Sequence, residues 1–181
     1  MGNAAAENKR VRQAVTEALF ALMKRKNFSE ISVSDIVKEA KVARASFYRN
    51  FESREAVIDA FIRDFHAAVT RQPDDHSCSG SRSQAQIVEQ LERSFAMVLS
   101  KKAYVLALYN SGFQDRLQYI ADAYIEELAG DMRYSSADKY ILYCYSGAGM
   151  NMMVHWLRDG ANESPHELAV ACAGFFQQKF R

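Results

Sequence analysis

The sequence has few of the residues that mark fibrous, linker-like or disulfide-bonded chains. Its 181 residues include two prolines and eight glycines, too few for a collagen-like or low-complexity chain. The three cysteines, Cys78, Cys144 and Cys172, are odd in number and far apart, so they suggest neither a disulfide framework nor a metal-ligand spacing. We therefore expect a cytoplasmic protein without a metal site.

Long apolar runs and familiar catalytic motifs are also missing. No segment approaches the roughly 18 consecutive apolar residues of a membrane-spanning helix, and no membrane contact is expected. There is no glycine-rich phosphate loop, paired-histidine zinc motif or nucleophile elbow. The four histidines form no obvious acid–base set with nearby carboxylates. These absences predict that the chain is not an enzyme, has no catalytic residues and needs no cofactor.

What is present is a large apolar fraction and an uneven distribution of charge. Hydrophobic residues make up 49% of the chain, which is enough for a core in one or two small domains. Residues 1–65 hold 12 Lys/Arg and 9 Asp/Glu, a balance of +3, whereas the remaining residues hold 11 and 13, a balance of −2. The positive sign of the N-terminal part suits contact with nucleic acid.

Apolar residues recur at helical spacing along almost the whole chain, and no strand pattern stands out. We predict an all-α fold of about nine helices. A stretch rich in serine and aspartate, residues 72–83, reads as a loop. The division expected is an N-terminal domain of residues 1–53 and a C-terminal domain of residues 54–181. The expected helices are residues 7–26, 33–40, 44–50, 54–71, 84–99, 101–110, 114–129, 136–159 and 165–180.

Several helix ends carry recognisable capping residues. Ser32 with Asp35, and Ser164 with Glu167, have the spacing of a capping box, and Pro165 suits the first helical position. The same logic makes Ser53 and Ser100 expected N-caps and pairs Ser135 with Asp138. Gly160 is the expected residue just past the end of the long helix that begins near residue 136.

The short helices at residues 33–40 and 44–50, separated by a three-residue turn, have the proportions of a helix-turn-helix unit. In the run KVARASFYRNF, residues 41–51, Val42, Phe47 and Phe51 have the spacing to face the neighbouring helices. The polar residues between them would then face the DNA major groove, where arginine reads guanine and tyrosine hydroxyls meet phosphate. The alternative is a solvated basic helix face, which the surrounding pattern disfavours.

The run ISVSDIVKEAKVARASFYRNFESREAVIDAFI, residues 31–62, resembles the DNA-binding segment of the TetR/AcrR-type transcriptional regulators. The resemblance covers about a third of the chain and includes cap, core and contact positions. It implies a three-helix DNA-binding domain followed by a helical ligand-binding and dimerisation domain. The DNA-facing residues that it implies are Ser32, Ser34, Lys41, Arg44, Ala45, Ser46, Tyr48, Arg49 and Arg54.

The turn between the two short helices departs from the family pattern. Lys41 stands where the family usually has glycine, and Ala43 where it often has serine or threonine. A lysine in a left-handed turn conformation costs roughly 1 kcal/mol. Either the turn bends differently, or the strain is accepted in return for an additional charge facing the DNA.

The last two expected helices have a composition that suits the dimer interface implied by the resemblance. The helices at about 136–159 and 165–180 are rich in apolar and small residues, and the family dimerises through its last two helices. We therefore expect a homodimer that places two recognition helices on a pseudo-palindromic operator.

A small-molecule effector site is the other property that the resemblance implies. Pockets are mostly apolar with a few polar groups, and the C-terminal half has many aromatic residues with polar tips, although most such residues belong to ordinary cores. The tail, residues 156–169, resembles the end of the dihydroxyacetone-kinase regulator-like subgroup. The candidate ligand-binding residues are Tyr104, Tyr109, Tyr119, Tyr145, Asn151 and His155.

These observations predict a DNA-binding transcriptional regulator, a repressor released from its double-stranded operator by an effector. The alternative is a protein of the same family that acts as an activator, or as a partner-binding coregulator without direct operator binding.

Overall fold

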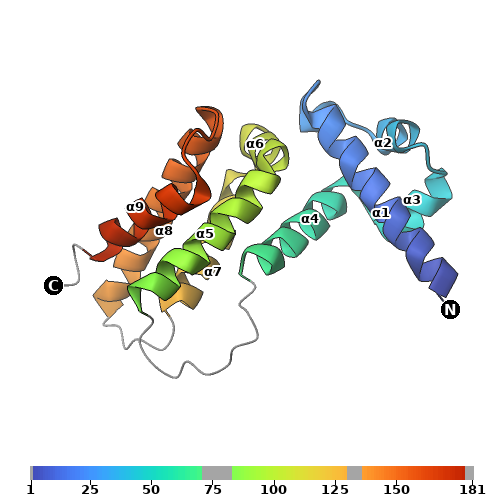
Figure 1. The fold of residues 1–181 in the computed structure, drawn as a ribbon. Coiled ribbons are helices and arrows are strands. Elements are labelled where there is room, and N and C mark those ends of the chain that lie inside the picture. Colours follow the sequence, from blue (N-terminus) through green and yellow to red (C-terminus); the bar gives the residue numbers. More distant parts are fainter. Residues whose placement is uncertain (1, 71–82, 130–135, 178–181) are drawn as a thin grey trace. The chain divides into compact units, whose positions relative to one another are not determined.

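The computed structural model describes residues 2–70, 83–129 and 136–177, and in these ranges it is built from helices alone (Figure 1). The absence of any strand from these ranges confirms the predicted all-α class. A short 3₁₀ helix, η1, follows the first α-helix and was not expected. The elements are α1 Gly2–Met23, η1 Phe28–Glu30, α2 Val33–Ala40, α3 Arg44–Asn50, α4 Arg54–Val69, α5 Gln84–Ser100, α6 Lys102–Asn110, α7 Gln114–Ala129, α8 Ser136–Arg158 and α9 Pro165–Gln177.

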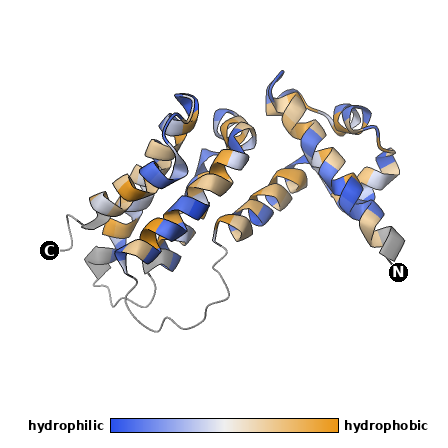
Figure 2. Cartoon of the chain, viewed as in Figure 1, coloured by the Kyte–Doolittle hydropathy of each residue, from blue (hydrophilic) through white to orange (hydrophobic). Residues whose placement is uncertain are grey.

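The chain divides into two compact units, residues 1–65 and 66–181. This division falls inside α4, later than the boundary at residue 53 that the sequence suggested. The physical reason is aromatic packing. The ring of Phe61 lies 4.8 Å from that of Phe20 in α1 and 5.9 Å from that of Phe65. The contact with Phe20 joins α4 to the first unit, and hydrophobic residues are prominent along the visible side of α4 in Figure 2.

In the first unit, α1 packs against both α2 and α3. Val15 and Leu19 from α1, Ile36 from α2 and Phe47 from α3 have no solvent exposure. Phe47 also lies 5.9 Å from Phe51, so both phenylalanines are core residues, as their spacing predicted. Helices as short as α2 and α3 are not stable alone, so it is packing into this shared apolar core that stabilises them.

In the second unit, α9 packs along α5 and α8 along α7. The ring of Phe95 in α5 meets Trp156 in α8 edge to face at 6.1 Å. A polar contact fixes α7 against α8, because the amide of Gln118 donates to Asp122 at 2.8 Å and to Ser146 at 2.7 Å. None of the helices in the described ranges is long and apolar enough to cross a membrane.

Most of the predicted helix ends are found in the structure. The Ser32–Asp35 box is formed, Ser53 accepts from the backbone of Ala56, and Ser164 and Glu167 cap α9 reciprocally. Gly160 has the expected positive φ of 108°. The Ser135–Asp138 box lies outside what the structure describes.

Two expectations about helix ends were wrong. The hydroxyl of Ser100 donates to the carbonyl of Met97 at 2.7 Å, so this residue ends α5 instead of capping α6. The first helix runs Gly2–Met23 rather than 7–26. Its C-terminal end is earlier because the amides of Arg25 and Lys26 both turn back to the carbonyl of Leu22.

Candidate nucleic-acid interface

The start of α2 is fixed by a closed set of hydrogen bonds around Asp35. Its carboxylate accepts from the backbone amide of Ser32 at 2.8 Å and from the Ser32 hydroxyl at 2.7 Å, and it lies 3.0 Å from the ammonium of Lys26. These contacts, the Ser32 amide first, lower the pKa of Asp35 well below its ordinary value. Ser32 thus serves first as a helix cap, and its side chain remains at the exposed start of α2.

The turn between α2 and α3 contains a strained lysine. Lys41 has φ 54° and ψ 41°, the left-handed conformation that glycine adopts without cost. The next amide, that of Val42, donates to the carbonyl of Val37 at 3.1 Å and closes the end of α2. The turn therefore keeps the tight geometry that a glycine would give, but it also carries an exposed positive charge.

Aromatic and cationic contacts fix α3 on the side that faces the core of the first unit. Phe47 is buried at its centre. Arg12 from α1 donates to the carbonyl of Asn50 at 3.1 Å, and its guanidinium lies 4.6 Å from the ring centroid of Phe51. Arg12 was not among the residues predicted from the sequence. The available signal was its position three residues before Val15, which puts it beside the apolar face of the first helix, in a basic N-terminal stretch.

The outward side of α3 carries two sets of hydrogen-bonded polar side chains. Arg44 donates to the hydroxyl of Ser34 in α2 at 3.3 Å and to the hydroxyl of Tyr48 at 3.3 Å. One turn further on, Arg49 donates to Ser46 at 2.9 Å. The structure thus brings together five of the residues that the sequence pointed to. The bonds of Arg44 are long and solvent-exposed, so a phosphate or base can replace them at little cost.

The solvent exposure of its side chains divides α3 into an outer polar side and an inner apolar side. Arg44, Ala45, Tyr48 and Arg49 are exposed and occupy one side of the helix, while Phe47 points into the core. Tyr48 is a large side chain with 49% exposure. The small side chain of Ala45 leaves space for the edge of a base pair, and its methyl group suits contact with thymine. Ala43 provides no side-chain cap at the start of α3.

No carboxylate forms an ion pair with the positive charges at this surface in the described ranges, although Arg49 contributes, after Arg10, to lowering the pKa of Glu7 in α1. Within the described ranges, no Asp or Glu oxygen lies within 4 Å of the charged groups of Lys41, Arg44 or Arg49. Some other cations of the first unit are paired: Arg25 lies 2.8 Å from Glu39, and Lys26 is 3.0 Å from Asp35. Lys41, Arg44 and Arg49 therefore place exposed positive charge on the turn and the outer side of α3, the arrangement that attracts phosphate.

Arg54 has different neighbours from those that the sequence suggested. Its guanidinium donates to the carbonyls of Phe28 at 2.9 Å and Ser29 at 3.1 Å, and also to that of Ile31. It lies 4.7 Å from the ring centroid of Phe28 and 2.8 Å from the carboxylate of Glu55. These contacts tie η1 to the start of α4. We therefore assign Arg54 a positioning role and leave it out of the DNA-facing set.

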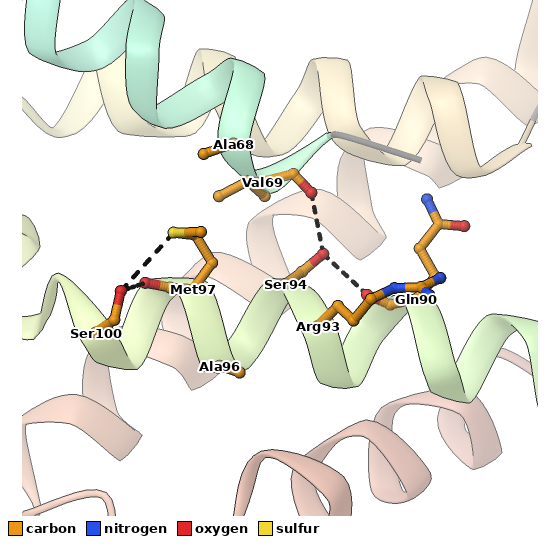
Figure 3. Close-up of a pocket in the computed structure, with 8 residues that line it drawn as sticks. All are labelled: Ala68, Val69, Gln90, Arg93, Ser94, Ala96, Met97 and Ser100. Carbon is orange, nitrogen blue, oxygen red and sulfur yellow. Dashed lines mark hydrogen bonds between the residues drawn. The ribbon is translucent and has the colours of Figure 1, made fainter. Parts of the chain in front are cut away.

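The second unit contains a cavity of about 440 Å³ between the last turn of α4 and helix α5 (Figure 3). Its walls are mainly apolar, and two buried polar residues from α5, Gln90 and Ser94, face it from one side. Their i, i+4 spacing on an otherwise apolar helix face was a signal that the sequence analysis missed. The lining residues are Ala68, Val69, Gln90, Arg93, Ser94, Ala96, Met97 and Ser100.

None of the six candidate ligand-binding residues lines this cavity. Tyr145 is buried against Phe175 with ring centroids 5.7 Å apart, and Tyr109 lies under the guanidinium of Arg158 at 5.0 Å. Tyr119 is 71% exposed. The structure therefore distributes these residues over several surfaces of the second unit. Those remaining are Tyr104, which lies beneath the ammonium of Lys101 at 5.7 Å, and Asn151 and His155, which are exposed on α8.

Two helices joined by a tight turn and supported by a longer helix, with unpaired cations on the outer side of the second, define a helix-turn-helix DNA-binding protein. Family comparisons agree. Residues 15–61 match the profile "Bacterial regulatory proteins, tetR family", and residues 86–178 match the profile "Transcriptional regulator C-terminal region". The chain belongs to the TetR family of bacterial transcriptional regulators.

Individual relatives extend this assignment. A segment of 46 residues is 41% identical to the uncharacterized HTH-type transcriptional regulator YdgC of Bacillus subtilis (strain 168); it spans 25% of this chain and 24% of that protein. The chain thus covers about a quarter of the curated relative that it matches.

Solved structures match over nearly the whole chain. A TetR transcriptional regulator from Streptococcus agalactiae 2603V has a TM-score of 0.69 at 16% identity, with 95% of this chain and 96% of that chain covered. The dihydroxyacetone kinase operon activator DhaS has a TM-score of 0.67 at 16% identity, covering 93% and 95%. A TetR-like regulator from Rhodococcus sp. RHA1 has a TM-score of 0.64 at 19% identity, covering 99% of both chains. At these identities the likeness establishes the fold.

Proposed function

We propose that the chain is a repressor that binds a pseudo-palindromic operator as a homodimer and leaves it when an effector binds the second unit. The observation that supports operator binding most directly is the outer side of α3. Its Arg44–Tyr48 cluster is exposed, has no carboxylate partner in the described ranges and rests on the buried Phe47. A helix that rests on a buried core residue and presents exposed arginines is suited to the major groove.

Apolar exposure on the last two helices supports the homodimer. Most of the large hydrophobic side chains that are exposed in the described ranges lie on α8 and α9, and such patches mark protein interfaces. A two-fold axis along these helices would give each dimer two recognition helices, spaced for successive turns of DNA. The residues concerned are Tyr140 at 70% exposure, Ile141, Val170 and Phe175 at 52%.

Effector control is supported by the cavity in the second unit. Ala68 and Val69, which contribute to it, belong to α4. The same helix begins at Arg54, which is tied to η1 in the first unit. A ligand that contacts the last turn of α4 therefore acts on a helix that is continuous with the DNA-binding unit.

Selection of binding sites from random double-stranded DNA, followed by affinity measurement, tests the proposal. We expect the full chain to recover a sequence with two related half-sites. Tyr48→Phe, which removes one hydroxyl from the exposed cluster, is expected to lower the affinity for that sequence several-fold without changing thermal unfolding. Failure to select any sequence would favour the coregulator alternative.

Activation rather than repression is the second candidate, because the structural relative DhaS is described as an operon activator. The two are separated by placing the selected operator upstream of a reporter gene. A repressor lowers reporter expression in the absence of effector, and an activator raises it.

A further inference from the structure

We propose that the cavity between α4 and α5 binds a neutral, mainly apolar molecule that carries one hydrogen-bond acceptor, such as the carbonyl of a ketone or an ester. This inference rests on the proposed effector response and adds to it a site and a chemical class of ligand. The buried polar groups of the lining indicate the acceptor, and the lack of an unpaired charge among the described lining residues indicates that the ligand is neutral.

The acceptor is required by Gln90. Its side chain is only 7% exposed, and its amide Nε2 has no hydrogen-bond partner among the described residues. Buried polar groups in folded proteins are almost always satisfied, and an isolated donor is costly. Figure 3 shows this side chain rising from α5 at one side of the cavity. A ligand oxygen that accepts from Nε2 would satisfy it.

Ser94 does not offer a second contact of the same kind. Its hydroxyl already lies 3.2 Å from the carbonyl of Val69, 3.0 Å from that of Gln90 and 2.8 Å from the hydroxyl of Tyr124 (Figure 3). A serine hydroxyl has one proton and two acceptor sites, and its single proton is directed to these carbonyls, so Ser94 has no donor left for a ligand. Ser94 therefore holds the last turn of α4 against α5, and Gln90 remains as the buried donor in the lining.

Charge balance makes the ligand neutral. Among the described lining residues, Arg93 alone is charged, and it forms an ion pair with Glu89 at 3.0 Å, with both side chains largely in solvent. A carboxylate in the cavity would lose hydration without gaining an unpaired cation. The remaining walls are mainly methyl, methylene and thioether groups, and the hydroxyl of Ser100 already donates to the carbonyl of Met97 at 2.7 Å. Met97 can adapt to different shapes. The volume, about 440 Å³, lies in the range of small-molecule pockets.

Three small aromatic molecules of similar size separate these requirements. Acetophenone has one neutral acceptor, ethylbenzene has none, and benzoate is charged. They are titrated into the full chain carrying ¹³C-methyl methionine, without DNA, and the signal of Met97 is followed after assignment with Met97→Leu. We expect a saturable shift with acetophenone, binding at least fivefold weaker with ethylbenzene, and no shift with benzoate.

Gln90→Leu tests the donor directly. This variant keeps the volume of the side chain and removes Nε2, so acetophenone is expected to lose its advantage and bind no better than ethylbenzene. The thermal midpoint should not fall, because the change removes an unpaired buried donor. Ala68→Phe, which fills the cavity from α4, provides a second test and should abolish the Met97 shift with both neutral molecules.

Absence of a saturable Met97 shift with acetophenone would overturn the proposal. So would an unchanged preference for acetophenone in Gln90→Leu, or equal binding of benzoate. A folded chain that selects an operator but binds none of the neutral molecules refutes this inference and leaves DNA binding intact. Binding of acetophenone by a chain that selects no DNA would support the ligand site and refute the proposed function as a DNA-binding regulator.

Discussion

The two units of the chain place their polar and apolar groups in opposite ways. In the first unit, polar and cationic side chains stand outside on an aromatic support, with Arg44 and Tyr48 exposed above the buried Phe47. In the second unit, an unsatisfied polar group lies inside, at Gln90, and large apolar side chains lie outside on α8 and α9. A surface of the first kind suits a large anionic partner, whereas the second unit suits a small neutral ligand and a second copy of the chain.

The largest effect is expected from removing Phe47, the buried side chain on which α3 rests. Phe47→Ala deletes a fully buried ring, and such changes cost about 3–5 kcal/mol of stability. We expect the first unit to unfold at much lower denaturant concentration and DNA binding to disappear. Tyr48→Ala is the matched control, because its ring is half exposed. This variant should lose DNA binding but little stability, and equal destabilisation of both variants would contradict the account.

A charged substitution on α9 tests whether the exposed apolar side chains of α8 and α9 form the dimer interface. Val170→Asp places a carboxylate on the exposed side of α9. Burying that charge unpaired in a dimer costs about 3 kcal/mol. Sedimentation is expected to show that the dimer dissociates at least a hundredfold more readily. Tyr119→Asp makes the same kind of change at an exposed position of α7, outside the two helices of the proposed interface, and should leave the dimer unchanged. A Val170→Asp dimer as tight as that of the unmodified chain would place the interface elsewhere.

Lys41 lets stability and DNA affinity be separated within the first unit. Lys41→Gly relieves the left-handed backbone at φ 54° and is expected to raise the free energy of unfolding by about 1 kcal/mol. The same change removes a charge beside α3, so DNA affinity should fall and its salt dependence should decrease by about one counterion. Lys41→Arg keeps the charge and the strain. A lower stability for Lys41→Gly would show that the side chain itself supports the turn.

The smallest expected effect concerns the pH dependence of the α2 cap. The pKa of Asp35 is lowered on folding, mainly by the Ser32 amide. A lowered pKa means that this carboxylate stabilises the fold at pH values above its unfolded pKa, ordinarily near 4, and that the contribution fades as the pH falls further. Asp35→Asn should therefore be less stable than the unmodified chain at pH 7, with a difference that shrinks below pH 4. A constant difference from pH 7 to pH 2 would exclude this cause.

The sequence predicted the first unit in more detail than the second. The ends of α2 and α3, the Ser32–Asp35 cap and the inward Phe47 and Phe51 could be read directly, because caps and helical periodicity are local properties of the chain. Contacts across long separations could not be read in this way. Arg54 forms its bonds with carbonyls more than 20 residues earlier, and no local pattern distinguishes this role from a phosphate contact.

The second unit shows the same limit more strongly. Its helices were predicted nearly to their ends, but a cavity depends on how side chains from different helices meet. Aromatic residues with polar tips drew attention to Tyr119 and Tyr145, one of which is exposed and the other packed in the core. The cavity instead uses Gln90 and small residues such as Ala68, whose chemistry becomes visible only when α4 and α5 lie together.

The central claim, that the unpaired cations of α3 meet DNA, is tested most directly by salt-dependent binding of the unmodified chain, Arg44→Ala and Arg116→Ala to the selected operator. Arg116 lies on α7 and provides an equal change of charge in the second unit. The account predicts that Arg44→Ala loses at least tenfold in affinity at fixed salt, as expected for a base or phosphate contact of about 1–3 kcal/mol. Arg116→Ala should bind like the unmodified chain. Equal affinities and equal salt slopes for all three proteins would contradict the assignment of α3 to the DNA surface.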